Sequence, residues 1–359
     1  MFVRDFEFDL PAELIAQTPA SERGSSRLLH LSRSTGAIAH TTISALPDLL
    51  VPGDLLVVND SRVFPARLLG RRVPSGGSVE CLLIGRSRDR DLSDHVRPEA
   101  DQVWEALMHP GQKLKPGARV IFDGPVVVHG EVLERHFFGR RLIRLWTGDG
   151  SPLDRAVDAT GHVPLPPYIK RDDSALDRER YQTVFARERG SVAAPTAGLH
   201  FSAGLLDAIA ARGIETVGLT LHVGYGTFQP VRVERVEDHT LEPERYEISP
   251  TAAAAVNRAL DKGRRIVAVG TTTTRTLEAA ARANNGRLAP GAAATDLFIY
   301  PGFEFRVIKG LLTNFHLPQS SLLMLVSAFA GREHVLAAYR EAVAARYRFY
   351  SYGDAMLIV

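Results

Sequence analysis

Residues 264–283 read RRIVAVGTTTTRTLEAAARA, and this stretch decides the class of fold. Its first part, 264–270, is a short apolar run typical of a strand that is buried on both faces. The run passes through four threonines, 271–274, into an alanine-rich segment typical of a helix. Strands that alternate with helices in this way form parallel or mixed sheets, so we expect an α/β fold with a mixed sheet.

Strands and helices are also predicted to alternate on both sides of this stretch. The stretch 201–213 predicts a helix, with Ser202 as its N-cap and Gly213 just past its end. A strand follows at 214–223. Further helices are predicted at 251–262, 320–330 and 334–346, and further strands at 296–300 and 355–359.

Residues 62–150 have a different pattern, in which short predicted strands are separated by turns rich in Gly, Pro and Asp. Regular spacing of this kind is typical of a small antiparallel barrel or sandwich. We therefore predict an α/β domain formed by residues 1–61 and 151–359, interrupted by an inserted β-barrel domain at 62–150. The mixed-charge segment 86–100 is expected to be a solvated loop. The predicted strands are 79–84, 103–108, 119–122, 126–133 and 141–146.

The composition is that of an ordinary globular protein: 359 residues, 45% hydrophobic and 23% charged. The single cysteine, Cys81, lies in a predicted strand and is expected to be a buried thiol. No secretory signal is evident, and the longest apolar run, 322–330, is far below the roughly 20 residues that span a bilayer. We therefore expect a cytoplasmic protein without a membrane partner, and a monomer. The net charge of +2 is compatible with an RNA partner without requiring one.

Several common chemistries are excluded by missing motifs. The sequence has no G-x-x-x-x-G-K-[ST] phosphate loop and no G-x-S-x-G nucleophile turn. The Gly-Tyr-Gly at 224–226 lacks the third glycine of a dinucleotide fingerprint, because position 229 is Gln. One cysteine and no Cys/His cluster leave no zinc pattern, so no metal and no cofactor are expected.

Polar and small residues gather where predicted strands end and helices begin. Ligands of α/β sheets bind beyond the carboxyl ends of the strands, and the helix start at 270–276 suits a carboxylate or phosphate. His200, His222 and His316 all lie in these segments. A single histidine of this kind is usually structural, but three in one setting favour a site. The segments are 58–67, 194–201, 220–230, 270–276 and 312–318.

Long motifs in this order resemble those of the S-adenosylmethionine:tRNA ribosyltransferase-isomerase family of queuosine biosynthesis. The likeness covers nearly the whole chain. Segment 238–244 (DHTLEPE) departs from the family pattern. The matching motifs are 8–11 (FDLP), 26–29 (SRLL), 59–62 (NDSR), 195–201 (PTAGLHF), 221–228 (LHVGYGTF), 270–278 (GTTTTRTLE), 298–302 (FIYPG), 313–318 (TNFHLP) and 347–356 (YRFYSYGDAM).

The resemblance implies two substrates, S-adenosylmethionine and a tRNA that carries 7-aminomethyl-7-deazaguanine at the wobble position. The implied products are epoxyqueuosine-tRNA, adenine and methionine, with S-adenosylmethionine consumed as a substrate and no metal involved. The chemistry needs a base for the proton beside the sulfonium, help for the departing adenine and a neutral amine as nucleophile.

The resemblance also suggests roles for particular residues. His222 or His200 is the candidate general base, because imidazole titrates near neutral pH. His316 is expected to assist the departure of adenine, and Asp60 to contact the ribose or the sulfonium. Arg275 and the threonine run are expected to hold the methionine carboxylate. Candidates for binding S-adenosylmethionine are Thr196, Gly198, Gly224, Tyr225, Gly226, Thr227, Thr271, Thr272, Arg275 and Asn314, and candidates for tRNA phosphates are Arg62, Arg67, Lys170 and Arg171.

Two functions of other classes remain open from the residues alone. One is an S-adenosylmethionine-dependent RNA methyltransferase, against which stands the lack of a glycine-rich loop after the first strand. The other is a non-catalytic RNA-binding module with a β-barrel, against which stand the polar strand-end loops and the weak net charge. Product analysis separates the three, because only the transferase-isomerase releases free adenine.

Overall fold

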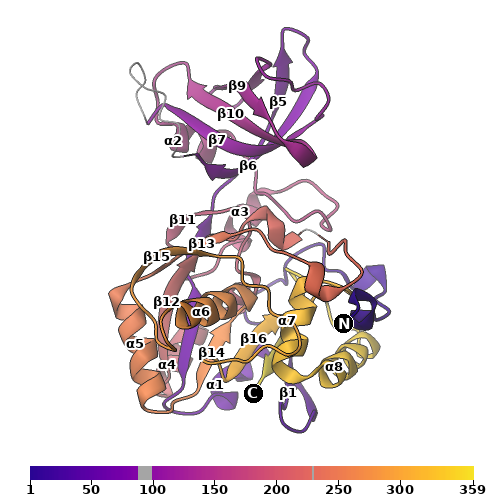
Figure 1. Ribbon diagram of the computed structural model, residues 1–359, viewed down its shortest axis with the longest axis vertical. Coiled ribbons are helices and arrows are strands. Elements are labelled where there is room, and N and C mark those ends of the chain that lie inside the picture. Colours follow the sequence, from indigo (N-terminus) through magenta and orange to yellow (C-terminus); the bar gives the residue numbers. More distant parts are fainter. Residues whose placement is uncertain (88–98, 229) are drawn as a thin grey trace.

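The chain folds into a large part built on a nine-stranded sheet and a small closed barrel that lies above it in Figure 1. The computed structural model describes residues 1–87, 99–228 and 230–359. The expected α/β fold with a mixed sheet and an inserted antiparallel barrel is confirmed. Most of the predicted loop 86–100 lies outside the described residues, as does Gln229.

The centre of the large sheet is parallel. β12, β3, β14 and β16 run side by side in the same direction, whereas β13, β15, β17 and β2 each pair antiparallel with a neighbour. In sheet order the strands are β15 (Gly291–Thr295), β13 (Glu244–Ile248), β12 (Glu215–Leu221), β3 (Leu55–Asn59), β14 (Ile266–Val269), β16 (Gly310–Asn314), β17 (Ala355–Ile358), β1 (Arg27–Leu31) and β2 (Ile38–Thr42).

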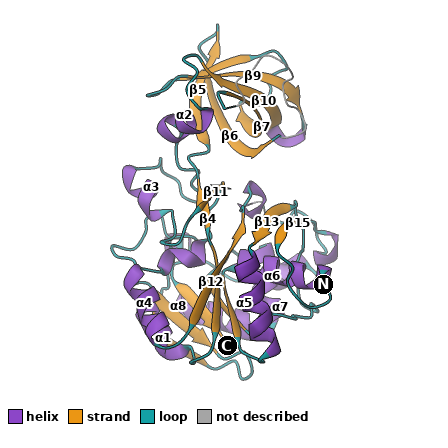
Figure 2. Ribbon diagram, turned by 90° about the vertical axis from the view of Figure 1, so that its left-hand side faces the viewer, coloured by secondary structure: helices purple, strands orange, loops and turns teal. Residues whose placement is uncertain are grey.

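Helices cover both faces of this sheet (Figure 2). One apolar core joins the sheet to α5 (Pro250–Asp261), α6 (Thr271–Ala283) and α7 (Ser321–Ala330), and a second joins it to α1 (Leu46–Leu49) and α4 (Ala203–Ala211). Within the described residues no single helix is long and apolar enough to cross a bilayer; α7 and α8 (Arg332–Ala344) together pass by composition but meet at a bend of 116°.

The inserted barrel closes around its own apolar core. Cys81 is fully buried there, as expected, and burial raises the pKa of its thiol. The barrel lies between Arg67 and Thr147, inside the predicted span 62–150, and the domain boundaries themselves stay a prediction. In barrel order the strands are β10 (Arg140–Thr147), β7 (Asp101–His109), β6 (Ser78–Arg86), β5 (Arg67–Val73), β8 (Arg119–Phe122) and β9 (Val128–Arg135).

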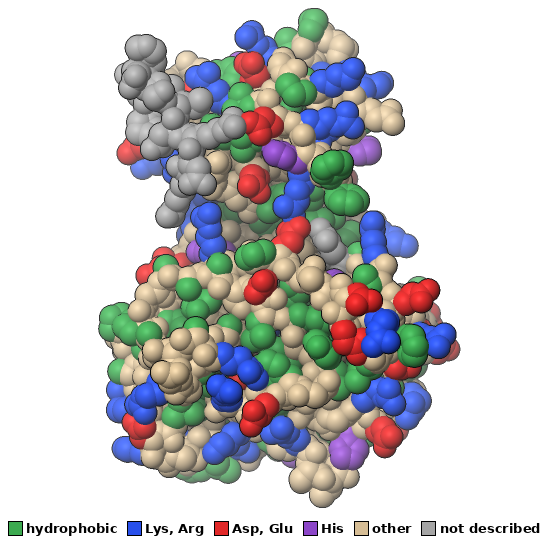
Figure 3. All heavy atoms as spheres, in the orientation of Figure 1, with side chains coloured by type: hydrophobic (Ala, Val, Ile, Leu, Met, Phe, Trp, Pro, Cys, Tyr) green, Lys and Arg blue, Asp and Glu red, His purple; other side chains and the backbone are tan. Residues whose placement is uncertain are grey.

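Short elements connect the barrel to the sheet. β4 (Ser61–Val63) pairs with β11 (Glu188–Ser191), and α2 (Leu153–Thr160) and α3 (Ala175–Arg180) follow the barrel in sequence. The space-filling view shows a narrow waist at this level (Figure 3). The barrel is therefore joined to the large part by a narrow connection, which begins directly after the end of β3.

The strand predicted at 296–300 is wrong, because this segment is a loop. Both backbone groups of Leu297 are bonded by side chains, since its amide donates to Thr295 Oγ1 at 3.1 Å and its carbonyl accepts from α6. Arg275 Nε donates to the Leu297 carbonyl oxygen at 2.9 Å. Further along, Glu278 accepts hydrogen bonds from the amides of Arg306, Val307 and Ile308 at 2.9, 3.0 and 3.1 Å.

We expect Glu278→Ala to lower the free energy of unfolding by roughly 3 kcal/mol or more. The Glu278 side chain is fully buried, and its removal leaves three backbone N–H groups without an acceptor, each worth about 1–3 kcal/mol. Urea unfolding measures the change. The matched control is Glu341→Ala on an exposed face of α8, with an expected change of about 0.5 kcal/mol or less. Equal stability of the two variants would contradict the capping role.

Candidate functional site

The carboxyl ends of β14 and β16 open into a cavity of about 560 Å³, counting the part open to solvent. The wall is mostly apolar with a few polar side chains. The lining residues are Tyr168, Ala193, Ala194, Pro195, Thr196, Ala197, Val223, Gly270, Thr271, Thr272, Thr313, Asn314, Phe315, His316, Leu322, Tyr350 and Ser351.

The first turn of α6 forms one wall of the cavity. Gly270 is its N-cap with φ of 92°, a conformation that favours glycine, and no side chain caps the helix start. Thr271 and Thr272 follow and line the cavity with their hydroxyl groups nearby. Backbone N–H groups at an uncapped helix start attract a carboxylate or another anion. The predicted role of this threonine run in binding an anionic group is therefore compatible with its position.

Asn314 ends β16 in the cavity wall. Its Nδ2 lies 3.1 Å from the Tyr350 carbonyl oxygen, which only accepts, so this contact fixes the orientation of the amide. The second Nδ2 proton points to His200 Nε2, also at 3.1 Å, so His200 carries its proton on Nδ1 and donates it to Ser26 Oγ at 2.9 Å. Asn314 Oδ1 is buried without a partner among the described residues and is an acceptor for a ligand.

His200 is thus held by protein on both ring nitrogens. It ends the short helix η5 (Thr196–His200) and does not line the cavity. Burial lowers the pKa of His200 to about 4, so the ring is neutral near pH 7. The structure gives His200 the position of a residue that orients Asn314.

His316 is the one predicted histidine in the cavity lining. Its Nε2 is bonded to Thr313 Oγ1 at 2.9 Å, which leaves Nδ1 for a ligand. Its backbone N–H donates to Tyr339 Oη at 3.0 Å. Burial lowers the pKa of His316 to about 3, so this ring is also neutral near pH 7.

His222 lies beside β11, after the end of β12, and is not in the cavity lining. A Cβ on Gly190 would lie 2.7 Å from its ring, so only glycine fits there. Burial lowers the pKa of His222, opposed by the charge of Glu188. Its Nδ1 is buried and without a partner among the described residues, and the next residue, Val223, lines the cavity.

Asp60 is buried and fully bonded outside the cavity lining. Oδ1 accepts from Thr220 Oγ1 at 2.6 Å, and Oδ2 accepts from Arg187 Nη2 at 2.5 Å. Its backbone carbonyl accepts from the amides of Arg187 and Glu188. The structure therefore places Asp60 where it holds β11 against the end of β3, and its predicted contact with ribose or sulfonium stays a prediction.

Arg275 also lies outside the cavity lining. Nη1 donates to Glu244 Oε2, and Nε and Nη2 donate to the carbonyls of Leu297 and Thr295. Glu244 Oε1 in turn accepts from the Gly224 amide at 2.9 Å. The pair fixes the turn that contains Gly224, Tyr225 and Gly226, none of which lines the cavity. The side chain of Thr227 is outside the described part of the molecule.

The two predicted residues of η5 differ in position. Thr196 lines the cavity. Gly198 packs against the Phe185 and Thr183 side chains, and a Cβ there would lie 2.8 Å from each. Within residues 1–87, 99–228 and 230–359, no group of three or more His, Cys, Asp or Glu side chains is arranged to hold a metal ion.

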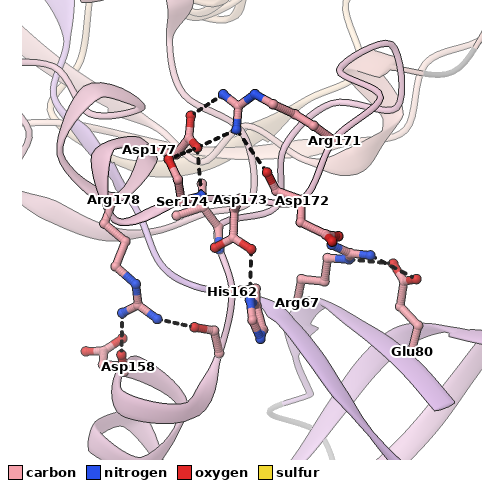
Figure 4. A network of polar contacts seen from close by, with 12 residues as sticks. Arg67, Glu80, Asp158, His162, Arg171, Asp172, Asp173, Ser174, Asp177 and Arg178 are labelled. Carbon is pink, nitrogen blue, oxygen red and sulfur yellow. Dashed lines mark hydrogen bonds and ion pairs between the residues drawn. The ribbon is translucent and has the colours of Figure 1, made fainter. Parts of the chain in front are cut away.

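Two of the four predicted tRNA residues are committed to ion pairs at the barrel junction (Figure 4). Arg67 donates to Glu80 at 2.8 Å. Arg171 makes a two-pronged pair with the buried carboxylate of Asp177, at 2.7 and 2.8 Å. Burial alone would raise the pKa of Asp177, but hydrogen bonds from Arg171, Tyr352 and Ser174 lower it. Arg62 and Lys170 are exposed, and their side chains have no ion-pair partner in the described segments.

Sequence reasoning missed several residues that position the site. Asn59, Ser26 and Tyr350 were quoted only as parts of longer motifs, and Glu244 belongs to the segment that departs from the family pattern. The signal for Asn59 was its place as the last residue of a predicted buried strand. Nothing in the sequence linked Glu244 to Arg275.

Comparison with known proteins identifies relatives over the full length. A sequence model of the queuosine biosynthesis protein family matches residues 3–358. Proteins named S-adenosylmethionine:tRNA ribosyltransferase-isomerase from Heliobacterium modesticaldum and Citrifermentans bemidjiense are 50% and 51% identical, each over 100% of both chains. A crystal structure of S-adenosylmethionine tRNA ribosyltransferase from Thermotoga maritima is 37% identical, with a TM-score of 0.54, over 99% of this chain and 100% of that one.

We expect the protein to lose stability as the pH falls from about 6.5 towards 4, partly through His200 and His316. The unfolded chain binds these protons near pH 6.5, whereas the folded chain binds them only near pH 4 and pH 3, so stability decreases with acid. Near pH 6 each histidine adds roughly 1 kcal/mol per pH unit to the slope of the free energy of unfolding against pH. Urea unfolding at pH 5, 6 and 7 should show a flatter profile for His200→Gln. The exposed His136→Gln is the control, and identical slopes for wild type and His200→Gln would refute the expectation.

Proposed function

The chain belongs to the queuosine biosynthesis protein family, and we propose that its strand-end cavity binds S-adenosylmethionine for reaction with tRNA. The activity is the transfer and isomerisation of the ribosyl group of S-adenosylmethionine, for which full-length relatives about 50% identical to this chain are named. The finer proposal is that 7-aminomethyl-7-deazaguanine at the wobble position of tRNA receives this group. The products are then epoxyqueuosine-tRNA, adenine and methionine.

The cavity itself is the observation that supports this location. It joins an uncapped helix start at Gly270–Thr272 to an apolar wall that includes Phe315 and Leu322. S-adenosylmethionine has the same division, with a charged amino acid at one end and a flat nucleoside at the other. We propose that the first turn of α6 holds the methionine carboxylate, and that the apolar wall contacts the nucleoside.

Each chemical step then needs a particular service. A base removes the proton from the carbon beside the sulfonium, adenine leaves, the neutral aminomethyl nitrogen attacks, and methionine departs as the epoxide closes. These steps are proton transfers and displacements, so we propose that S-adenosylmethionine is consumed and that no metal or other cofactor takes part. We further propose that the protein acts in the cytoplasm as a monomer.

Two histidines are proposed to act on the substrate. His316 lines the cavity and is proposed to assist the departure of adenine through Nδ1. The general base is proposed to be His222, not His200. His222 Nδ1 has no partner among the described residues, whereas both ring nitrogens of His200 are bonded to protein. His200 and Asn314 then act as positioning residues.

We expect His222→Ala to lower the single-turnover rate of adenine release by roughly 10²–10⁴-fold, the usual contribution of a positioned base. Affinity for S-adenosylmethionine should change little, because a general base acts mainly in the transition state and contributes little to substrate binding. Ala197→Phe, which fills the cavity, should abolish S-adenosylmethionine binding. Rates and binding are measured on the same preparations, with thermal midpoints as a check on folding.

Three outcomes would contradict parts of this proposal. A folded His222→Ala protein within a few-fold of the wild-type rate would move the role of base to His200. Unchanged S-adenosylmethionine binding by Ala197→Phe would place the substrate outside this cavity. Methylated RNA and S-adenosylhomocysteine without free adenine would identify a methyltransferase.

We expect Arg62→Ala/Lys170→Ala to weaken tRNA binding and to flatten its salt dependence. Both side chains are exposed and unpaired within the described residues, so each is available for a phosphate. The slope of log affinity against log salt should fall by about 0.7–0.9 for each lost contact. Arg171→Ala is the contrasting variant, because it leaves the buried Asp177 carboxylate without its cation and should lower stability instead. A double variant with the wild-type slope would remove both residues from the tRNA surface.

A further inference from the structure

Two adjacent phenylalanines in the turn between β9 and β10 of the barrel are exposed to an unusual degree. Phe137 and Phe138 lie in the turn between β9 and β10, with exposed fractions of 86% and 91%. The other exposed large hydrophobic residues of the described chain range from 37% to 53%. Fully exposed neighbouring aromatic rings mark a surface that a partner covers.

The backbone of this turn is held in a demanding conformation. Phe138 has φ of 55°, in the left-handed region that bulky residues avoid, and Gly139 follows with φ of 82°. Such a conformation persists only where the surroundings enforce it, and it is concentrated at functional positions. It also directs the two consecutive rings outward instead of into the barrel core.

A buried arginine makes this turn rigid. The Arg141 side chain is almost completely buried and donates to the carbonyls of Leu114 at 2.8 Å and Arg140 at 2.7 Å. It also donates to the carbonyls of Gly111 and His136. The hydrogen bonds of this one guanidinium therefore join the turn to the neighbouring loop 110–115. They fix the backbone that carries the two rings.

Exposed cations lie next to the turn that carries the two rings. The loop 109–115 carries Lys113 and Lys115 and no acidic residue. On the turn itself, Arg135 is exposed, and Glu134 lies 3.4 Å from His136. Lys and Arg side chains also gather on the right-hand side of the barrel in Figure 3. Flat apolar faces among cations match single-stranded nucleic acid, which offers unpaired bases and phosphates together.

The start of β10, directly after the turn, also contacts the large domain. Arg140, the first residue of β10, forms an ion pair with Glu242, which lies two residues before β13. A Cβ on Gly226 would lie 3.8 Å from Glu242 Oε2, so this contact is beside the Gly224–Gly226 turn. A partner bound to the turn between β9 and β10 is therefore close to the loops at the ends of the large-sheet strands.

We propose that Phe137 and Phe138 form a stacking platform for unpaired bases in a loop of the tRNA substrate. This inference rests on the proposed function, because it takes tRNA as the partner. The rings supply sequence-independent stacking, and the lysines and Arg135 supply contacts to the phosphates of the same loop. The platform is a site for the partner and has no part in the chemistry of the cavity.

The test compares Phe137→Ser/Phe138→Asn with wild type for binding of the unmodified substrate tRNA. Asn at position 138 tolerates the left-handed backbone, so the turn keeps its shape. Affinity should fall about 5- to 150-fold for each stacked base that is lost. The salt slope should be unchanged, because no phosphate contact is removed. At saturating tRNA the adenine release rate and the affinity for S-adenosylmethionine should equal those of wild type.

Two further variants give controls. Phe137→Tyr/Phe138→Tyr keeps the aromatic faces and should bind as wild type. Leu69→Ser/Val127→Ser removes two other exposed apolar side chains of the barrel and should also bind as wild type. Removing unpaired bases from an anticodon stem-loop should weaken wild type more than the Ser/Asn variant.

The platform is overturned if the Ser/Asn variant binds tRNA within twofold of wild type. It is also overturned if that variant converts a dimer into a monomer in sedimentation, because the rings would then form an interface between copies. Either result can occur in a protein that still releases adenine with tRNA, so it leaves the proposed function standing. A wild-type protein that neither binds tRNA nor releases adenine would refute both.

Discussion

The side-chain amide of Asn59 holds the site segments together. Its Oδ1 accepts from the amides of Ser61 and Leu221, and its Nδ2 donates to the Leu221 carbonyl and to Thr272 Oγ1. One buried residue thus fixes the end of β3, the end of β12 and the first turn of α6. Only an amide offers two donors and an acceptor oxygen in this place, and an aspartate would lose both contacts made by Nδ2.

The ends of β12, β3, β14 and β16 divide the candidate residues into two groups. His316 and Asn314 line the cavity, and His200 lies behind them and is bonded to Asn314. His222 and Asp60 belong to the side that faces β11. β11 pairs with β4 between the sheet and the barrel (Figure 2), so the second group lies on the side of the connection to the barrel.

Local signals predicted most of the fold, because apolar runs, caps and turn residues act over a few positions. Thr271, Thr272, Asn314 and His316 were predicted as substrate-contacting residues from the family resemblance, and all four line the cavity. Residues whose role depends on a distant partner were assigned incompletely. Asp60 and Arg187 are 127 positions apart, and Arg275 and Glu244 are 31 apart. A sequence does not show whether a charged residue is free or is neutralised by an internal ion pair.

The same distinction explains why composition says little about the RNA surface. Arginines such as Arg67, Arg171 and Arg265 neutralise Glu80, Asp177 and Asp54, so they contribute to the net charge of +2 only together with their partners. Which cations remain open to a polyanion, and where they lie, depends on the fold. In the barrel, Lys113 and Lys115 are exposed on the loop that Arg141 joins to the turn with the two exposed rings. A weak net charge is thus compatible with strong local attraction, because binding depends on where unpaired charge lies.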